Sequence, residues 1–174
     1  MARDLIQFEY EDKNIGFTKL EKVNLISQNS KELRNTLNRA KEKLVVQGSS
    51  DEVNRMALES KKVKIFVSNE KEREKDFMHF RNSGLNQVLC NLAKKNNIAI
   101  AFNFNDLLKA SSWEQRSVTL GRIMQNIRLC RKAKVKMIFA SFAKKEEDIR
   151  PYNMLLSFTK VLGMSTKESK EAFL

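Results

Sequence analysis

The sequence contains few of the residues that bend, cross-link or catalyse. Its 174 residues include one proline, five glycines, two cysteines and one histidine. No apolar run approaches the roughly 20 residues that a membrane span needs, and the amino terminus lacks an apolar signal core, so we expect a cytoplasmic protein with no membrane partner. A disordered chain is excluded, because 41% of the residues are hydrophobic and eleven are phenylalanines.

The scarcity of histidine and cysteine restricts the possible chemistry. Cys90 and Cys130 lie in helical patterns beside apolar neighbours, which indicates reduced core residues. His79 lies in a charged loop, where a lone imidazole is typical of the surface. Metal clusters and His-dependent nucleophiles need more ligands or partners than these. We therefore expect no catalytic residue, no bound metal and no cofactor on the protein itself.

Three acidic residues near predicted strand ends are the remaining candidates for acid-base chemistry or a magnesium site. They are Asp51, Asp106 and Asp148. Helix caps and ion pairs explain the same residues, and we favour that interpretation.

Acidic residues are also in deficit: 33 Lys and Arg face 21 Asp and Glu, which gives a net charge of +12. Such a field favours a polyanionic partner, and nucleic acid is the best candidate.

Seven Lys or Arg and no acid lie between residues 116 and 136. There, Arg122, Arg128 and Lys132 fall with Gln125 on the helix face opposite an apolar stripe. We interpret this face as an RNA or DNA contact, although a solvated surface gives the same pattern. The apolar stripe consists of Leu120, Ile123, Ile127 and Cys130.

Apolar periodicity predicts alternating strands and helices. The predicted strands are 5–8, 23–26, 44–47, 65–68, 98–103 and 137–141; the predicted helices are 29–43, 51–57, 85–95, 113–133 and 151–163, with a short terminal helix from Ser165 or Thr166. Residues 69–81 form the longest predicted loop, and 104–112 a short connector.

The strands after Ile26 are apolar throughout, and a helix separates each from the next. This pattern is typical of a parallel sheet covered on both faces, in an open doubly wound sheet or a closed barrel. We therefore expect an α/β fold. No Gly-rich dinucleotide loop is present to favour the open sheet, and a barrel of this length would be trimmed relative to the usual ~250 residues. Residues 1–174 are expected to form a single domain.

The pattern of residues 81–103 predicts a loop, a helix, a tight turn and a buried strand. Leu85, Val88 and Leu89 begin an apolar stripe that is expected to cover the sheet. Ser83 is predicted as the helix N-cap, and Gly84 permits close approach of the chain or of a ligand. An anion site and a simple cap with a turn both fit these residues.

Several short runs are familiar in their order and spacing. They are 44–48, 51–59, 65–68, 82–89, 107–112, 148–151 and 162–164. Together they resemble protein component 3 of archaeal ribonuclease P, a family that includes the eukaryotic thirty-kilodalton subunit. Residues 1–43 match only loosely. The chain also departs from the family's pattern at Asn69-Glu70, at Asn82 and at Ser141-Phe142-Ala143.

The resemblance implies a TIM-barrel-like, non-catalytic protein subunit of an RNA-based endonuclease that removes the 5′ leader of precursor tRNA. The RNA performs the chemistry with magnesium, and a second small protein subunit pairs with this one in a hetero-oligomer. The resemblance also implies that this protein interacts with precursor tRNA only indirectly. A degenerate metal-dependent barrel phosphoesterase and a generic basic RNA-binding protein remain as alternatives.

Matching positions imply functional roles for five residues: Arg55, Arg81, Ser83, Gly84 and Arg150. The charge pattern adds Arg122, Arg128 and Lys132 as candidate RNA contacts.

Overall fold

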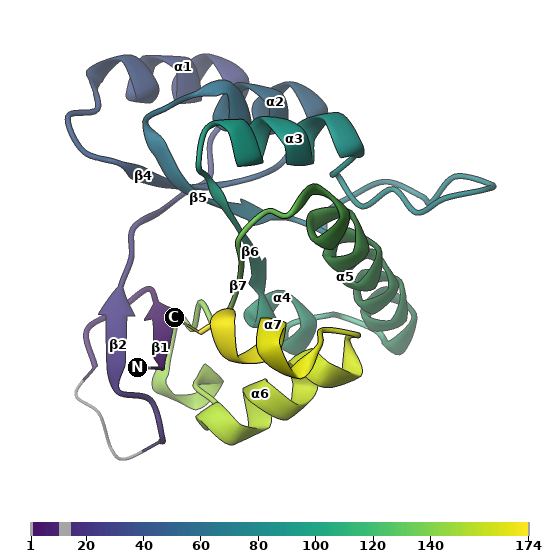
Figure 1. Ribbon diagram of the computed structural model, residues 1–174. Coiled ribbons are helices and arrows are strands. Elements are labelled where there is room, and N and C mark those ends of the chain that lie inside the picture. The colour runs from purple at the N-terminus through teal and green to yellow at the C-terminus, as the bar shows by residue number, and fades with distance from the viewer. Residues whose placement is uncertain (1, 11–14, 174) are drawn as a thin grey trace.

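A parallel β-sheet organises the computed structural model, which describes residues 2–10 and 15–173 (Figure 1). Five strands lie in the order β3-β4-β5-β6-β7, and β1 and β2 form a separate parallel pair. Their bounds are Arg3–Ile6 for β1, Lys19–Lys22 for β2, Leu25–Ile26 for β3, Leu44–Gln47 for β4, Val63–Ser68 for β5, Ala99–Asn103 for β6 and Met137–Ala140 for β7.

From β3 to β7, helices connect consecutive strands and cover one side of the sheet (Figure 1). Their bounds are Ser30–Arg39 for α1, Asp51–Glu59 for α2, Gln87–Lys95 for α3, Phe104–Leu108 for α4, Trp113–Ala133 for α5, Tyr152–Val161 for α6 and Thr166–Glu171 for α7, with a 3-10 turn at Glu146–Asp148. Side chains of Asn29, Ser50, Asn86 and Ser112 cap α1, α2, α3 and α5. These caps satisfy backbone N–H groups that the first helical turn leaves without partners.

Alternating side chains divide the apolar residues into two layers. Phe66, Phe102 and Phe139 pack between the sheet and the helices, whereas Ile65 and Val67 point to the other side. There they meet residues of β1, β6, β7 and the segment after β7. We call this second set the inner layer; its buried members are Leu5, Val23, Ile65, Val67, Ala101, Ala140 and Phe142. The sheet therefore curves around an apolar interior.

The expected closed barrel is shown only in part. Just past the end of β7, the N–H of Phe142 donates to the carbonyl of Leu5 at 2.9 Å. Buried Asp4 accepts from the N–H of Ser141 at 2.7 Å and from its hydroxyl at 2.6 Å. These contacts join β1 to the end of β7, but no ladder joins β2 to β3 within the described residues. The architecture is a mixed α/β fold with a parallel sheet.

Several predicted boundaries were wrong near the amino terminus. The strand expected at 5–8 lies at Arg3–Ile6. Of the strand expected at 23–26, only Leu25–Ile26 forms β3, and β2 at Lys19–Lys22 was not predicted. The helix expected to reach residue 43 ends at Arg39, because Ala40 adopts extended backbone angles (φ −62°, ψ 127°). Strand β4 and helix α5 have the predicted bounds. Short elements without strong caps or periodicity account for the errors.

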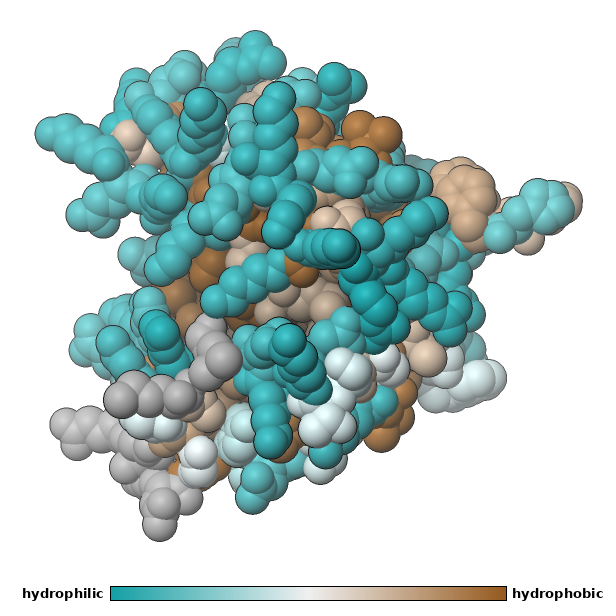
Figure 2. Space-filling model, in the orientation of Figure 1, coloured by the Kyte–Doolittle hydropathy of each residue, from teal (hydrophilic) through white to brown (hydrophobic). Residues whose placement is uncertain are grey.

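The face seen in Figure 2 is mostly hydrophilic, with apolar atoms showing between long polar side chains. Lys and Arg stems cover apolar surface while their charged ends stay in water. No helix in the described part of the chain is long and apolar enough to cross a membrane.

Gly48 follows β4 at a place with no room for a side chain. A Cβ there would lie 2.6 Å from Oδ1 of Asn54 and 2.6 Å from Cζ of buried Phe66. We expect Gly48→Ala to lower the free energy of unfolding by about 1–3 kcal/mol, because a packed core yields little to an added methyl group. Urea unfolding measures this change, and unaltered stability would contradict the packing described here.

Candidate nucleic-acid interface

A long loop, residues 69–86, leaves the carboxyl end of β5 and returns at the start of α3. It projects from the body as the teal arm in Figure 1. Loops longer than about 12–15 residues are uncommon in compact domains and are usually functional. Because charged residues dominate residues 70–76, polar contacts rather than an apolar core must hold that part of the loop in place.

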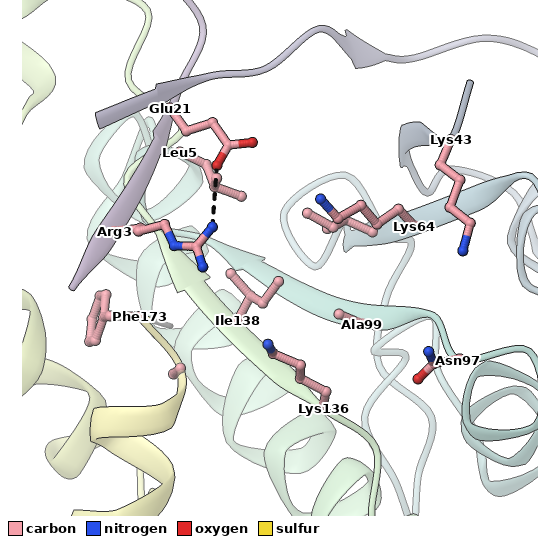
Figure 3. A pocket seen from close by; sticks show the side chains of 12 residues that line it. Arg3, Leu5, Glu21, Lys43, Lys64, Asn97, Ala99, Lys136, Ile138 and Phe173 are labelled. Carbon is pink, nitrogen blue, oxygen red and sulfur yellow. Dashed lines mark ion pairs between the residues drawn. The ribbon is translucent and has the colours of Figure 1, made fainter. Parts of the chain in front are cut away.

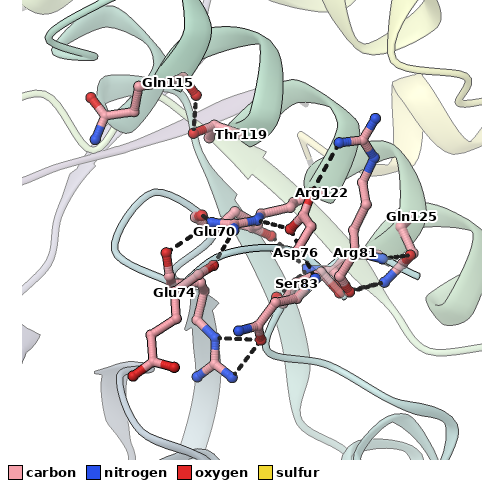
Figure 4. Close-up of polar contacts among 12 residues, drawn as sticks. Glu70, Glu74, Asp76, Arg81, Ser83, Gln115, Thr119, Arg122 and Gln125 are labelled. Atoms are coloured by element: carbon pink, nitrogen blue, oxygen red, sulfur yellow. Dashed lines mark hydrogen bonds and ion pairs between the residues drawn. The ribbon is translucent and has the colours of Figure 1, made fainter. Parts of the chain in front are cut away.

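Arg122 of α5 provides most of these contacts (Figure 4). Its side chain is 4% exposed, and its Nε donates to Oδ1 of Asp76 at 2.8 Å. Nη1 donates to the carbonyls of Glu70 (2.8 Å) and Arg73 (3.2 Å), and Nη2 donates to the carbonyl of Glu74. One buried guanidinium thus fixes the path of residues 70–76.

This arrangement corrects the basic face predicted on α5. Arg122 is buried and Gln125 is half-buried, whereas Arg128 and Lys132 are exposed. The loop covers the first two residues of that face, which the helical charge pattern could not reveal. Arg122 therefore holds the loop in place, and of the predicted cations on this face only Arg128 and Lys132 remain on an open surface.

Asp76 makes a second set of contacts that holds the loop together. Its Oδ1 also accepts from the N–H of Asn82 at 2.9 Å, and its Oδ2 lies 3.1 Å from Nη1 of Arg81. Burial would raise the pKa of Asp76, but the hydrogen bonds from Arg122 and Asn82 and the charges of both arginines lower it below its usual value. The ionised carboxylate ties the outgoing side of the loop to the returning side.

Ser83 was wrongly predicted as the cap of α3. Asn86 caps that helix, accepting from the N–H of Leu89 at 2.9 Å. The Ser83 hydroxyl is buried and instead accepts from Nε2 of Gln125 at 2.8 Å. The Ser83 hydroxyl thus contacts α5 and not the first turn of α3.

Gly84 takes a left-handed backbone conformation, with φ +77°. Its carbonyl accepts from Nδ2 of Asn54 on α2 at 3.0 Å. Asn54 also accepts, through Oδ1, from the N–H of Ser49 at 3.0 Å. A conformation that L side chains rarely adopt thus lets the returning loop contact α2.

Glu70 lies at the base of the loop and is 1% exposed. Its Oε1 accepts from the Ser68 hydroxyl at 2.6 Å and from Nδ2 of Asn126 at 2.8 Å. Burial raises the pKa of Glu70 to about 7, and these hydrogen bonds oppose the shift only in part. The carboxyl group therefore changes charge near neutral pH inside the protein.

A groove of about 520 Å³ lies between the loop, α2 and α3. It brings together four predicted residues: Arg55, Arg81, Ser83 and Gly84. It also contains residues that the sequence did not single out. Phe77 and Phe80 are 54% and 60% exposed, with ring centroids 4.6 Å apart. Val88, predicted to be buried, is 66% exposed and lines the same groove.

Cations beside exposed aromatic rings are typical of sites for single-stranded nucleic acid, because the cations attract phosphates and every base can stack on a ring. A recognisable signal was present, since Phe77, Met78 and Phe80 interrupt a highly charged loop. Asp76 and Asn54 gave no such signal, because their roles depend on partners far away in the sequence.

The remaining candidates lie outside this groove. Arg150 is half-buried and donates to the carbonyls of Glu147 at 2.6 Å and Ile149 at 2.8 Å. Arg128 and Lys132 are exposed on α5 and do not line the groove. Of the eight predicted residues, four therefore line the groove, Arg122 is buried behind the loop, and Arg128, Lys132 and Arg150 lie elsewhere.

Ion pairs explain two of the three acidic candidates, as favoured from the sequence. Asp51 pairs with Arg73 at 2.6 Å, and Asp148 pairs with Lys109 at 2.6 Å. Burial raises the pKa of Asp106 to about 6. No group of three or more His, Cys, Asp or Glu that could hold a metal is found in residues 2–10 and 15–173.

The predicted environments of the cysteines and the histidine are confirmed. Cys90 and Cys130 are buried free thiols, and His79 is exposed.

Removing Arg122 should release the loop. We expect Arg122→Ala to cost about 3–5 kcal/mol of folding free energy, because it leaves Asp76 and several carbonyls without their partner. Arg128→Ala on the same helix is the matched control and should stay within about 0.5 kcal/mol of the parent protein. Urea unfolding and limited proteolysis of residues 69–86 measure both effects. Equal stability of the two variants would contradict the anchoring role.

Titration of Glu70 should make stability depend on pH. Burial raises its pKa from the ordinary value of 4.5 to about 7 in the folded chain, so the folded state holds the proton more tightly. The contribution is present below about pH 4.5 and is lost as pH rises toward 7. Between pH 5 and 7.5 the parent protein should lose about 2 kcal/mol of folding stability through this group, and Glu70→Gln should not show that loss. Chemical unfolding at the two pH values tests this, and identical pH dependence in both proteins would refute it.

Comparison with known proteins places this geometry in a family. The model of the family described as RNase P subunit p30 matches residues 6–174. A ribonuclease P protein component 3 of Methanosarcina acetivorans is 31% identical over 160 residues, which cover 90% of this chain and 63% of the relative. One from Methanocaldococcus jannaschii is 29% identical over 136 residues, covering 76% of this chain and 55% of the relative. The chain thus spans about 60% of the length of these relatives.

Solved structures agree. A chain in the cryo-EM structure of archaeal ribonuclease P with mature tRNA superposes with a TM-score of 0.73 and 25% identity, covering 89% of this chain and 66% of that one. An amidohydrolase gives a TM-score of 0.56 at 11% identity, covering 88% and 40%, a likeness that concerns the fold alone. The match over residues 6–174 shows that the chain belongs to the RNase P subunit p30 family.

Proposed function

We propose that this chain is an RNA-binding protein subunit of ribonuclease P, which supports the catalytic RNA in removing the 5′ leader of precursor tRNA. Family membership over residues 6–174 is the observation that carries this proposal. The chemistry and its magnesium ions belong to the RNA, and the chain contributes neither a catalytic residue nor a cofactor. No specific observation favours a degenerate phosphoesterase or a generic basic binder.

The wider setting belongs to the same proposal. The chain works in the cytoplasm, in a hetero-oligomer with a second small protein subunit, and meets precursor tRNA indirectly. Its residues 1–174 form one domain with a trimmed, TIM-barrel-like architecture. The inner layer and the hydrogen bonds between β1 and the end of β7 support this architecture.

RNA contact is proposed first for the groove. Arg55 and Arg81 attract phosphates, while Phe77 and Phe80 offer exposed rings for unstacked bases. Stacking contributes about 1–3 kcal/mol per base in comparable sites. Arg122 acts as a positioning residue, because its contacts hold the loop that carries both rings.

The other predicted residues take secondary roles. Ser83 and Gly84 shape the groove wall. Arg128 and Lys132 supply a further phosphate contact on the open part of α5, and Arg150 supplies one near the start of α6.

Gly121 of α5 offers a way to displace Arg81 without touching it. A Cβ at Gly121 would lie 2.6 Å from Nε and 2.8 Å from Nη2 of Arg81. Because Arg81 is exposed, its side chain can move aside, and alanine favours the helix by about 1 kcal/mol over glycine. We expect Gly121→Ala to fold at least as stably as the parent protein but to bind RNA several-fold more weakly.

The experiment reconstitutes precursor-tRNA cleavage from ribonuclease P RNA and the partner subunit, with and without this chain. The chain should stimulate cleavage, and Gly121→Ala and Arg81→Ala should reduce RNA affinity to a similar extent. Arg34→Ala, which removes an exposed arginine from α1, is the matched control. Absence of stimulation by the parent chain would refute the proposed function. Equal affinities of Arg81→Ala and Arg34→Ala would refute the groove alone.

A further inference from the structure

A second cavity lies at the opposite end of the sheet, where the parallel strands begin (Figure 3). Its volume is about 360 Å³. Leu5, Ile65, Ala99 and Ile138 form apolar walls, and Phe173 closes one side. These residues come from β1, β5, β6, β7 and the chain after α7, so the cavity is the open end of the inner layer.

The pleat of the strands places cations in this opening. Arg3 precedes Leu5 by two residues, and Lys136 precedes Ile138 by two, so each cation shares the inner face with its apolar neighbour. Lys64 reaches the cavity by another route. Leu44 pairs with Val63 and Val45 pairs with Ile65, which makes Lys64 the extra residue of a β-bulge. Bulges re-aim side chains and occur often at the rims of barrels and beside functional sites.

Among the described residues, the lining of the cavity holds more cations than acids. Arg3, Lys43, Lys64 and Lys136 line it together with Glu21, whose Oε2 lies 3.8 Å from Nη1 of Arg3. The side chains of Lys43 and Lys64 make no hydrogen bond or ion pair with another described residue. Figure 3 shows Arg3, Lys64 and Lys136 arranged around Ile138. A negatively charged ligand in this opening is attracted by the cations that line it.

We propose that this cavity binds a phosphomonoester, with the phosphate at Arg3 and Lys64 and the organic part against Leu5 and Ile138. A phosphomonoester carries about −1.5 to −2 charges at neutral pH, which suits several cations better than the single charge of a diester. The volume lies at the lower end of the roughly 300–1,000 Å³ typical of small-molecule sites. The proposal is independent of the ribonuclease P role.

The same chemical group occurs on a free nucleotide and on the 5′ end of an RNA. A cavity closed by apolar walls can admit a free nucleotide or the 5′ end of an RNA. A phosphate within a continuous nucleic-acid strand would not fit, because the strand would have to continue through the walls. Binding experiments with both kinds of probe therefore identify the source of the phosphate.

Calorimetric titration of the full chain at physiological salt tests the proposal with AMP and with adenosine. AMP should bind and adenosine should not, because the rim recognises the phosphate. Lys64→Gln should weaken AMP binding by about tenfold or more, as expected for losing a charge-assisted contact. Lys31→Gln is the matched control, since it removes the same charge from an exposed position on α1. It should change the AMP affinity less than twofold, and Arg81→Ala should also leave it unchanged.

Absence of AMP binding at millimolar concentration overturns the proposal, as does equal weakening by Lys64→Gln and Lys31→Gln. Short oligoadenylates with and without a 5′ phosphate then separate the two sources. Competition with AMP by the phosphorylated oligonucleotide alone supports an RNA end as the ligand. Failure of both oligonucleotides to compete supports a free nucleotide. Equal competition by both would contradict recognition of a terminal phosphate.

Discussion

The buried guanidinium of Arg122 is the interaction on which the candidate interface depends. A charge removed from water is costly unless ion pairing and hydrogen bonds compensate it. Here Asp76 and three loop carbonyls provide that compensation, and residues 70–76 have no apolar side chain of their own to hold them. The burial of Arg122 and the conformation of residues 70–76 therefore require each other. The groove with its exposed rings exists only while both are in place.

Local signals predicted much of the fold but could not predict this anchor. Strand β4 has the bounds expected from its apolar run, and α5 has the bounds expected from its apolar stripe. Arg122 looked exposed because helical periodicity describes one helix and says nothing of what covers it. Its main partner, Asp76, lies 46 residues away in a loop without periodicity. Long-range polar contacts of this kind leave no pattern in a single sequence.

About half of the candidate interface could be predicted from the sequence. Arg55 and Arg81 were selected by matching position, and the structure brings them into one groove. Ser83 was assigned as a cap because serine suits that role, yet Asn86 suits it equally and stands one residue before the helix. Phe77 and Phe80 escaped notice because exposed aromatics in a charged loop fit neither a core nor a helix pattern. Composition rules identify cores better than they identify apolar residues kept at the surface for binding.

The acids, rather than the excess of cations, indicate where this protein can bind anions. Arg73 is engaged by Asp51, Arg122 by Asp76, and Arg131 by Glu168 at 2.7 Å. The hydrogen bond from Arg131 lowers the pKa of Glu168 to about 2, so that last pair persists at any ordinary pH. Such cations are committed to the fold and offer little to a ligand. A net charge of +12 therefore does not by itself locate a site. At the cationic opening, the side chains of Lys43 and Lys64 have no such partner in the described chain. In the groove, Arg55 and Arg81 pair with Glu59 and Asp76, so the exposed rings of Phe77 and Phe80 are what distinguish that site.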